Sequence, residues 1–199
     1  SGITKALEDY MSQNNIECVV YDKIKPNPTV KNVNEAKQLY IENNCQGIIA
    51  FGGGSSMDCA KATGACIAYP NKTLEQMKGL LKVWKKLPPL VAIPTTAGTG
   101  SEVTNISILE LTVRNTKFGL AVDELYPDYA VLIPELLTDL PYKFFATSSI
   151  DALVHAMESY LSPKSTSLSR KFSLMAIDLI LGGYVKMAEK GQDEYKNLL

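Results

Sequence analysis

Two apolar runs, each followed by a loop of small residues, constrain the fold of this 199-residue chain more than any other feature. Residues 47–51 lead into three glycines, and Leu90–Pro94 leads into the threonine- and glycine-rich segment Thr95–Gly100. A short strand that is apolar on both faces is typical of a parallel sheet covered by helices. We therefore expect an α/β fold with a largely parallel sheet.

Hydrophobic periodicity predicts helices beside these strands and a purely helical region towards the end of the chain. Helices are predicted at 4–14, at 33–43 and from the glycines to Ala65. Further strands are predicted at 17–21, 107–113 and 129–133, and helices without an intervening strand at 140–161 and 168–188. The sequence thus predicts an α/β domain at 1–139 and the beginning of a helical domain at 140–199.

Charge and cysteine content exclude several classes of protein. Lys and Arg total 20 and Asp and Glu total 21, so the chain lacks the excess of basic residues that a nucleic-acid partner requires. The four cysteines form no CxxC pair, which argues against a zinc ribbon or a thioredoxin-like motif. No apolar run approaches the roughly 20 residues of a membrane helix, and no secretory signal is visible. We expect a cytoplasmic protein with reduced thiols.

The glycine loop is a candidate phosphate site. Gly53 and Gly54 let the backbone approach a ligand closely, and Ser55 adds a hydroxyl donor at the start of a helix. The free N–H groups and positive dipole end of that helix suit a pyrophosphate. However, the loop is neither GxGxxG nor a P-loop, and a plain strand-to-helix turn explains it equally well. Asp58 also fits an ordinary first-turn acid, and Lys61 a solvated helix face.

The second loop supplies further small donors after a buried strand. Thr95, Thr96 and Thr99 lie in it together with two glycines. In doubly wound sheets, ligands bind at the carboxyl ends of the strands, so we expect both loops to face one crevice. A turn that caps a helix at Ser101, with Glu102 inside that helix, explains part of the loop without a ligand.

His155 is the one histidine of the chain, so no metal site can be built mainly from its imidazoles. Asp151 stands four residues earlier, which places an oxygen donor and a nitrogen donor on one helix face. This spacing suits two ligands of one metal ion. An Asp–His hydrogen bond without a metal explains the pair too, and on spacing alone it is the favoured interpretation.

Three motifs in this order resemble a known family: GGGSSMD at 52–58, PTTAGTGSEVT at 94–104 and DALVHAME at 151–158. The chain is similar to the iron-containing (group III) alcohol dehydrogenases, relatives of glycerol dehydrogenase and dehydroquinate synthase. The resemblance extends over essentially the whole chain. It implies a Rossmann-like, dehydroquinate synthase-like domain followed by an all-helical domain, with a metal in the cleft between them.

The resemblance also implies roles for the motif residues. Contacts with NAD or NADP are implied for Asn27, Gly53, Gly54, Ser55, Asp58, Thr95, Thr96, Thr99 and Lys117. Asp151 and His155 would be catalytic as two ligands of Fe(II), with Zn(II) as the alternative metal. The implied reaction is hydride transfer between the nicotinamide and a primary alcohol or aldehyde. A homo-oligomer, commonly a dimer, is a further family expectation.

Family members are much longer, so the resemblance also implies an internal fragment that lacks a strand unit at its beginning and further metal-binding histidines at its end. A catalytic metal normally has three protein ligands. One alternative is therefore a nucleotide-binding fragment without activity, because its metal site is incomplete. Another is a glycerol, polyol or 4-hydroxy acid dehydrogenase of the same superfamily.

Overall fold

A computed structural model of the protein describes residues 2–79, 82–111 and 116–197. The chain divides into two compact units. The first contains Ser1–Pro94 and Ser101–Leu132, and the second contains Thr95–Gly100 and Ile133–Leu199. Within the described ranges, no helix has the length and apolar character needed to cross a membrane.

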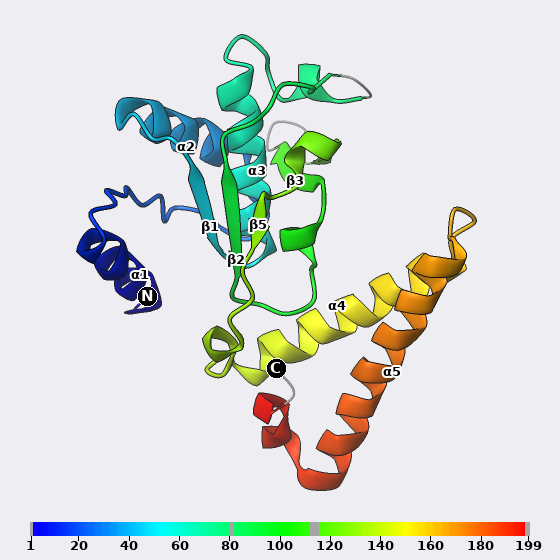
Figure 1. Ribbon diagram of the computed structural model, residues 1–199. Coiled ribbons are helices and arrows are strands. Elements are labelled where there is room, and N and C mark those ends of the chain that lie inside the picture. The colour runs from blue at the N-terminus through cyan, green and yellow to red at the C-terminus, as the bar shows by residue number, and fades with distance from the viewer. Residues whose placement is uncertain (1, 80–81, 112–115, 198–199) are drawn as a thin grey trace. The chain divides into compact units, whose positions relative to one another are not determined.

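The first unit is built on a parallel three-stranded sheet with the order β1-β2-β5 (Figure 1). Its strands are β1 (Ile48–Gly52), β2 (Leu90–Pro94) and β5 (Tyr129–Ala130). Both apolar runs are therefore strands, as predicted, and they pair from Ile48↔Leu90 to Gly52↔Pro94. Because β1 and β2 are parallel, the glycine loop and the Thr95–Gly100 segment both leave the same edge of the sheet.

A separate antiparallel hairpin accompanies this sheet. It consists of β3 (Ile106–Leu111) and β4 (Thr116–Ala121). β3 corresponds to the strand predicted at 107–113, of which residues 112–113 lie outside the described residues. β4 was not predicted. Along β4, exposed Lys117 and Gly119 alternate with buried Phe118 and Leu120. This alternation is the pattern of a strand with one solvated face.

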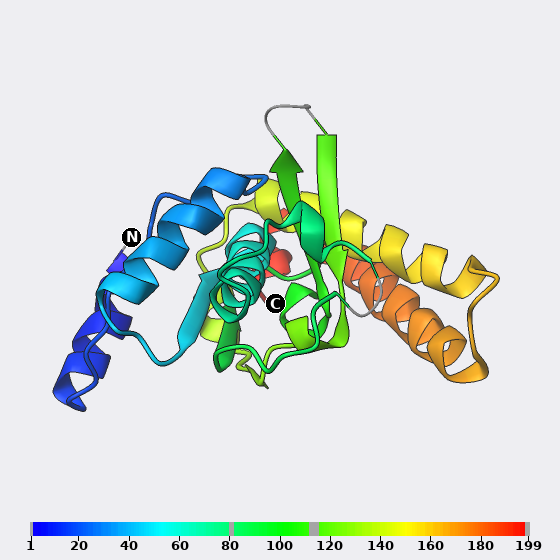
Figure 2. The same ribbon diagram turned by 90° about the horizontal axis from the view of Figure 1, so that it is seen from above.

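The helices of the first unit are α1 (Gly2–Gln13), α2 (Val30–Glu42) and α3 (Gly54–Ala68). α2 begins at a capping box formed by Thr29 and Asn32. α3 packs against α2, β1 and β3 (Figure 2). Small buried side chains, such as those of Ala62 and Ala65, let neighbours approach α3 closely on several sides. α3 is thus the central helix of the unit, and it starts in the glycine loop.

The predicted strand at 17–21 is wrong. These residues form neither helix nor strand and run as irregular chain between α1 and α2. No described strand pairs with these residues, so the segment lacks the ladder of hydrogen bonds that a strand requires. β-branched residues such as Val19 and Val20 favour a strand only where a partner strand is present. β5 is also shorter than predicted and comprises Tyr129–Ala130 instead of 129–133.

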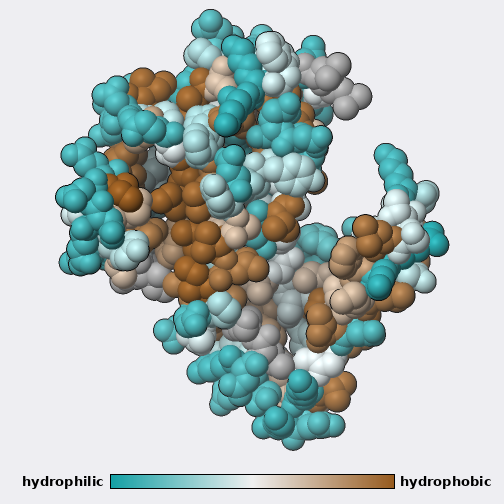
Figure 3. All heavy atoms as spheres, in the orientation of Figure 1, coloured by the Kyte–Doolittle hydropathy of each residue, from teal (hydrophilic) through white to brown (hydrophobic). Residues whose placement is uncertain are grey.

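The second unit consists mainly of two helices, α4 (Tyr142–Leu161) and α5 (Ser167–Lys190), which pack against each other. Both were predicted, with ends that differ by one or two residues. Phe145, Met187 and Tyr195 form a small core between them and the 3₁₀ helix Gln192–Asn197. Many large apolar side chains on these helices remain exposed (Figure 3), among them Phe144, Val154, Leu161, Leu168, Phe172, Met175, Leu179 and Val185. The domain boundary at 139/140 stays a prediction.

Candidate functional site

The first part of the candidate site is the turn from β1 into α3. Gly52 ends β1 with φ +144°, and a Cβ there would lie 3.0 Å from the Cβ of Ser56, so the turn requires glycine. Gly53 caps the helix without a side chain, and its carbonyl accepts a hydrogen bond from the Ser56 N–H at 3.0 Å. The N–H groups of Gly54 and Ser55 lie at the positive end of this 15-residue helix. This geometry can bind a phosphate group.

The threonine loop, Thr95–Gly100, belongs to the second unit, where it packs against α4. Gly98 has φ +137°, and a Cβ there would overlap the backbone carbonyl of Ser148, whose carbon would lie at 2.8 Å. Ser148 precedes Asp151 on α4 by about one helical turn. Thr95 and Thr96 in this loop are half-buried, and Thr99 is exposed. The structure therefore brings the threonine loop and the candidate metal ligands together within one unit.

Asp151 and His155 face each other on α4. The Asp151 Oδ1 and the His155 Nε2 are 3.8 Å apart, and both side chains are about half exposed. Atoms that each bind one ion at about 2.0–2.2 Å lie within roughly 4.4 Å of each other, so the pair fits two positions of a mixed N/O site. In the part of the chain that the structure describes, no group of three or more candidate ligands could hold a metal. The residues present thus fit part of a metal site.

A buried polar cluster on α3 was not predicted. Lys61 is only 1% exposed, so the interpretation as a solvated helix face is wrong. Its Nζ donates to the backbone oxygens of Ser101 at 2.6 Å and Ile106 at 2.9 Å, and to the Thr104 hydroxyl at 3.2 Å. Asp58 lies one turn earlier, and its carboxylate accepts a hydrogen bond from the Ser101 hydroxyl at 3.0 Å. The spacing of Asp58 and Lys61 was the available signal, but burial is not visible in the sequence.

Burial dominates the electrostatics of this cluster. It lowers the pKa of Lys61 to about 8, although the nearby charges of Asp58 and Glu102 act in the opposite direction. Burial also raises the pKa of Asp58, against hydrogen bonds from the Ile108 backbone and the Ser101 hydroxyl and the charge of Lys61. Both charged forms are therefore costly here, and the hydrogen bonds offset part of that cost.

Asn27 and Lys117 are the remaining residues with an implied cofactor contact, and both lie beside β3. Asn27 is exposed in a left-handed turn with φ +58°, just before α2. The next residue, Pro28, accepts a hydrogen bond from the Glu110 N–H at 2.8 Å, and Glu110 pairs with Lys117 in the hairpin. The exposed Lys117 side chain and the Asn27 turn thus flank the same stretch of β3.

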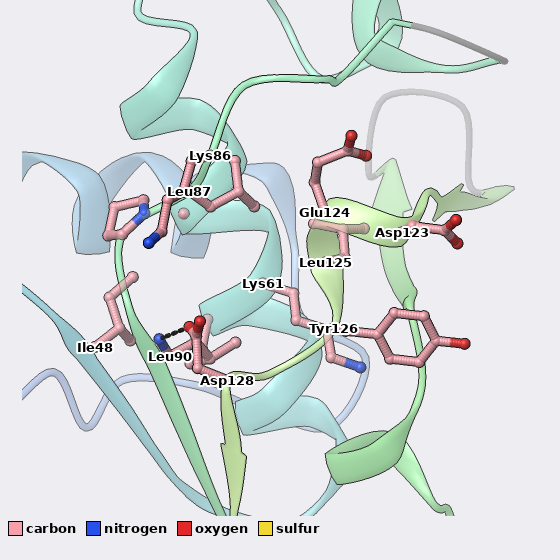
Figure 4. Close-up of a pocket in the computed structure, with 13 residues that line it drawn as sticks. Ile48, Lys61, Lys86, Leu87, Leu90, Asp123, Glu124, Leu125, Tyr126 and Asp128 are labelled. Carbon is pink, nitrogen blue, oxygen red and sulfur yellow. Dashed lines mark hydrogen bonds between the residues drawn. The ribbon is translucent and has the colours of Figure 1, made fainter.

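A cavity of about 230 Å³ lies at the opposite end of the sheet (Figure 4). Ile48 and Leu90, the first residues of β1 and β2, line it together with the 3₁₀ helix Asp123–Leu125. The Asp128 carboxylate accepts the Leu90 N–H at 2.8 Å and closes one side. Ligands of open α/β sheets bind beyond the carboxyl ends of the strands, so this cavity is not the candidate cofactor site.

Sequence profiles of one family match both parts of the chain. The profile described as "Iron-containing alcohol dehydrogenase" matches residues 1–134. The profile described as "Fe-containing alcohol dehydrogenase family, C-terminal" matches residues 145–197.

Individual relatives agree with these profiles. 4-Hydroxybutyrate dehydrogenase from Clostridium kluyveri is 51% identical over 146 residues, which cover 73% of this chain and 38% of the relative. Choline dehydrogenase from Bacillus subtilis is 37% identical over 190 residues, which cover 94% of this chain and 47% of that relative. The crystal structure of an iron-containing alcohol dehydrogenase from Thermotoga maritima has a TM-score of 0.87 at 33% identity and covers 99% of this chain and 54% of its own.

A crystal structure of 1,3-propanediol oxidoreductase gives a TM-score of 0.89 at 29% identity, over 100% of this chain and 53% of that one. The chain thus spans about half, or less, of the length of these relatives. Its structural neighbours share the Rossmann-like α/β fold, which confirms the fold class. The resemblance is confirmed as well, and the chain belongs to the iron-containing alcohol dehydrogenase family.

Proposed function

We propose that this chain supplies the dinucleotide site and two metal ligands of an NAD(P)-dependent alcohol dehydrogenase. The observation that carries the proposal is the contact of Gly98 with the Ser148 backbone. It places the threonine loop, a candidate cofactor segment, about one helical turn from Asp151. Hydride transfer requires the nicotinamide and the metal-bound substrate to be held close together. This contact joins the threonine loop, the candidate cofactor segment, to α4, which carries the candidate metal ligands.

In this proposal the cofactor pyrophosphate binds at the N-terminal end of α3. The N–H groups of Gly54 and Ser55 and the Ser55 hydroxyl are its donors, and Gly53 has no side chain to obstruct it. The hydroxyls of Thr95, Thr96 and Thr99 contact the cofactor further along. Asn27 and Lys117 contribute from the turn and hairpin that flank β3.

Asp151 and His155 are the proposed ligands of Fe(II), with Zn(II) as the alternative, since both metals accept one oxygen and one nitrogen ligand. When bound, the metal supplies Lewis-acid stabilisation of the alcohol or carbonyl oxygen. Half exposure of both side chains leaves room for further ligands.

A terminal primary alcohol, or its aldehyde, is the proposed substrate. 4-Hydroxybutyrate is a second candidate because a 4-hydroxybutyrate dehydrogenase is 51% identical over 146 residues. An inactive nucleotide-binding fragment is the competing candidate, supported by the incomplete set of metal ligands among the described residues. We also propose that the protein forms a homodimer and is cytoplasmic.

Binding and turnover measurements on the purified chain separate these candidates. NADH and NADPH are titrated by fluorescence, Fe and Zn are quantified, and NAD⁺ reduction is followed with 1-butanol and with 4-hydroxybutyrate. NADH binding without turnover supports the fragment candidate. A full complement of tightly bound metal with turnover excludes that candidate. Absence of NADH and NADPH binding at millimolar concentration contradicts the dinucleotide site.

A further inference from the structure

One buried ammonium connects α3 to the segment that directly follows the threonine loop. Four oxygen atoms lie within 3.2 Å of the Lys61 Nζ. They are the carbonyl and hydroxyl oxygens of Ser101, the Thr104 hydroxyl and the Ile106 carbonyl. All four belong to residues 101–106, whereas Lys61 lies about 40 residues earlier in the chain. An ammonium has only three N–H donors, so its hydrogen-bonding capacity is fully used by this one segment.

Asp58 strengthens the same connection from one turn earlier on α3. Its carboxylate accepts the Ser101 hydroxyl, and its backbone carbonyl accepts the Ser107 hydroxyl at 2.7 Å. Ser101 is therefore held from two sides, by the ammonium of Lys61 and by the carboxylate of Asp58. Both residues belong to the helix whose N-terminal end is the proposed pyrophosphate site.

From this geometry we infer that Lys61 is a positioning residue of the dinucleotide site, an inference that rests on the proposed function. Lys61 acts through Ser101, the residue to which the threonine loop is joined at its C-terminal end. Gly98 and Gly100 within that loop both have positive φ, +137° and +62°, where glycine gives the chain unusual freedom. The loop is joined at its two ends to Pro94, the last residue of β2, and to Ser101, which Lys61 and Asp58 of α3 hold by hydrogen bonds, so its position depends on both.

Four variants test this inference at graded severity. Ser101→Ala and Thr104→Val each remove one hydroxyl from the cluster and leave the ammonium in place. Lys61→Met removes the charge, and Lys61→Arg keeps it with a different donor geometry. Thr63→Val is the matched control, because Thr63 is a buried residue of the same helix with no hydrogen bond to the cluster.

Hydrogen exchange gives a readout that does not depend on the cofactor. We expect Ser101→Ala, Thr104→Val and Lys61→Met to speed amide exchange at least severalfold in peptides that cover 95–106, with little change in α2 or α5. Thr63→Val should leave the rates in these peptides unchanged. Equal rates at 95–106 in all variants, or an increase spread evenly over the chain, would overturn the inference even if the wild-type chain binds NADH.

NADH affinity gives the second readout. Loss of a hydrogen bond to a charged group predicts roughly tenfold weaker NADH binding in Lys61→Met and a smaller loss in Ser101→Ala. If these variants bind NADH as tightly as wild type while their exchange at 95–106 rises, the link between Lys61 and the cofactor is refuted. If no variant and no wild-type chain binds NADH, the proposed function fails, and hydrogen exchange still decides whether Lys61 positions the loop.

The pH dependence of NADH affinity distinguishes positioning by the ammonium from simple packing. Loss of the Lys61 proton, with a pKa of about 8, removes one donor from the cluster. Wild-type affinity should therefore fall above about pH 8, whereas Lys61→Arg stays charged and should show a flat profile. The other charged groups that face Lys61 or line the adjacent cavity are Asp58, Lys86, Glu102, Asp123, Glu124 and Asp128. Wild type and Lys61→Arg share these groups, so an equal pH dependence of NADH affinity in the two proteins would contradict the inference.

Discussion

Two acid–base pairs at helical spacing, one on α3 and one on α4, have opposite surroundings. Lys61 is 1% exposed and its ammonium is surrounded by oxygen acceptors, with Asp58 one turn away. Asp151 and His155 are about half exposed and 3.8 Å apart. The first pair is fully engaged inside its unit, whereas the second has capacity left for a ligand. In a linear sequence the two pairs look alike, and burial alone separates an anchoring pair from a candidate metal-binding pair.

The largest expected effect is on stability when the buried pair is broken. Lys61→Ala leaves the oxygen acceptors of Ser101, Thr104 and Ile106 without their donor and removes the stem of a fully buried side chain, so we expect a loss of about 3–5 kcal/mol in the free energy of unfolding. Urea denaturation followed by circular dichroism measures it. His155→Ala serves as the counterpart, with an expected change below about 0.5 kcal/mol. Similar losses in the two variants would remove the contrast between the pairs.

The pH dependence of stability is a second test of the surroundings of Lys61. The pKa of Lys61 in the folded protein is about 8, below its ordinary value of 10.5, so between these values the unfolded chain binds more protons. Stability therefore rises with pH across this window, and the contribution is lost as the pH falls through about 8. At about 1.4 kcal/mol for each pH unit between these two pKa values, the expected gain is about 3 kcal/mol.

This gain is measured as wild type minus Lys61→Met, because Cys59 and Cys66, whose pKa values burial raises to about 11, titrate in both proteins. A difference between the two proteins that does not change with pH from 8 to 10.5 would show that the Lys61 pKa is not lowered.

A smaller effect is expected where the threonine loop contacts the helix of the exposed pair. Gly98→Ala places a Cβ against the Ser148 carbonyl at a positive φ, which should cost about 1–3 kcal/mol. Gly182→Ala in α5 has open space around its Cβ and should stabilise the chain by up to about 1 kcal/mol. Thermal unfolding of both variants tests the opposite signs, and equal shifts would argue against the close contact.

The smallest effect on stability, with a selective effect on metal binding, is expected for Asp151→Asn and His155→Gln. Both side chains are half exposed, so the free energy of unfolding should change by less than about 0.5 kcal/mol. Affinity for Zn²⁺ or Co²⁺ should fall at least tenfold, since even the loss of a residue behind the ligands costs about 10–100-fold. Titration calorimetry measures the affinity, with Lys31→Met as an exposed control. Unchanged affinity would remove these residues from the metal site.

Local sequence patterns were sufficient for much of the fold. The apolar runs of β1 and β2 and the long periodic helices α4 and α5 were predicted close to their observed bounds, because each is encoded by its own residues. The strand at 17–21 was predicted wrongly, because a strand forms only where another strand pairs with it and its own residues do not show whether a partner exists. β4 was missed although its partner β3 is the preceding strand of the hairpin and buried Phe118 and Leu120 alternate with exposed residues.

The candidate site divides in the same way. The motifs around Gly53, Thr95 and Asp151 identified the family and the candidate residues. The profile matches to residues 1–134 and 145–197 confirm the family. The role of Lys61 was misjudged, because all of its partners lie 40 to 45 residues away. The proposed contacts of individual residues with cofactor and metal stay predictions until they are measured.

The sequence by itself determined the strands β1 and β2 with the loops that follow them, the long helices α4 and α5, the donor types at each loop, and the family. These properties depend on short spacings and on side-chain chemistry. Only the tertiary structure decided that Lys61 is buried against Ser101, and that Gly98 lies against the backbone of Ser148. Both contacts join residues that are distant in the chain, and their energies depend on packing and desolvation, which exist only once those residues meet.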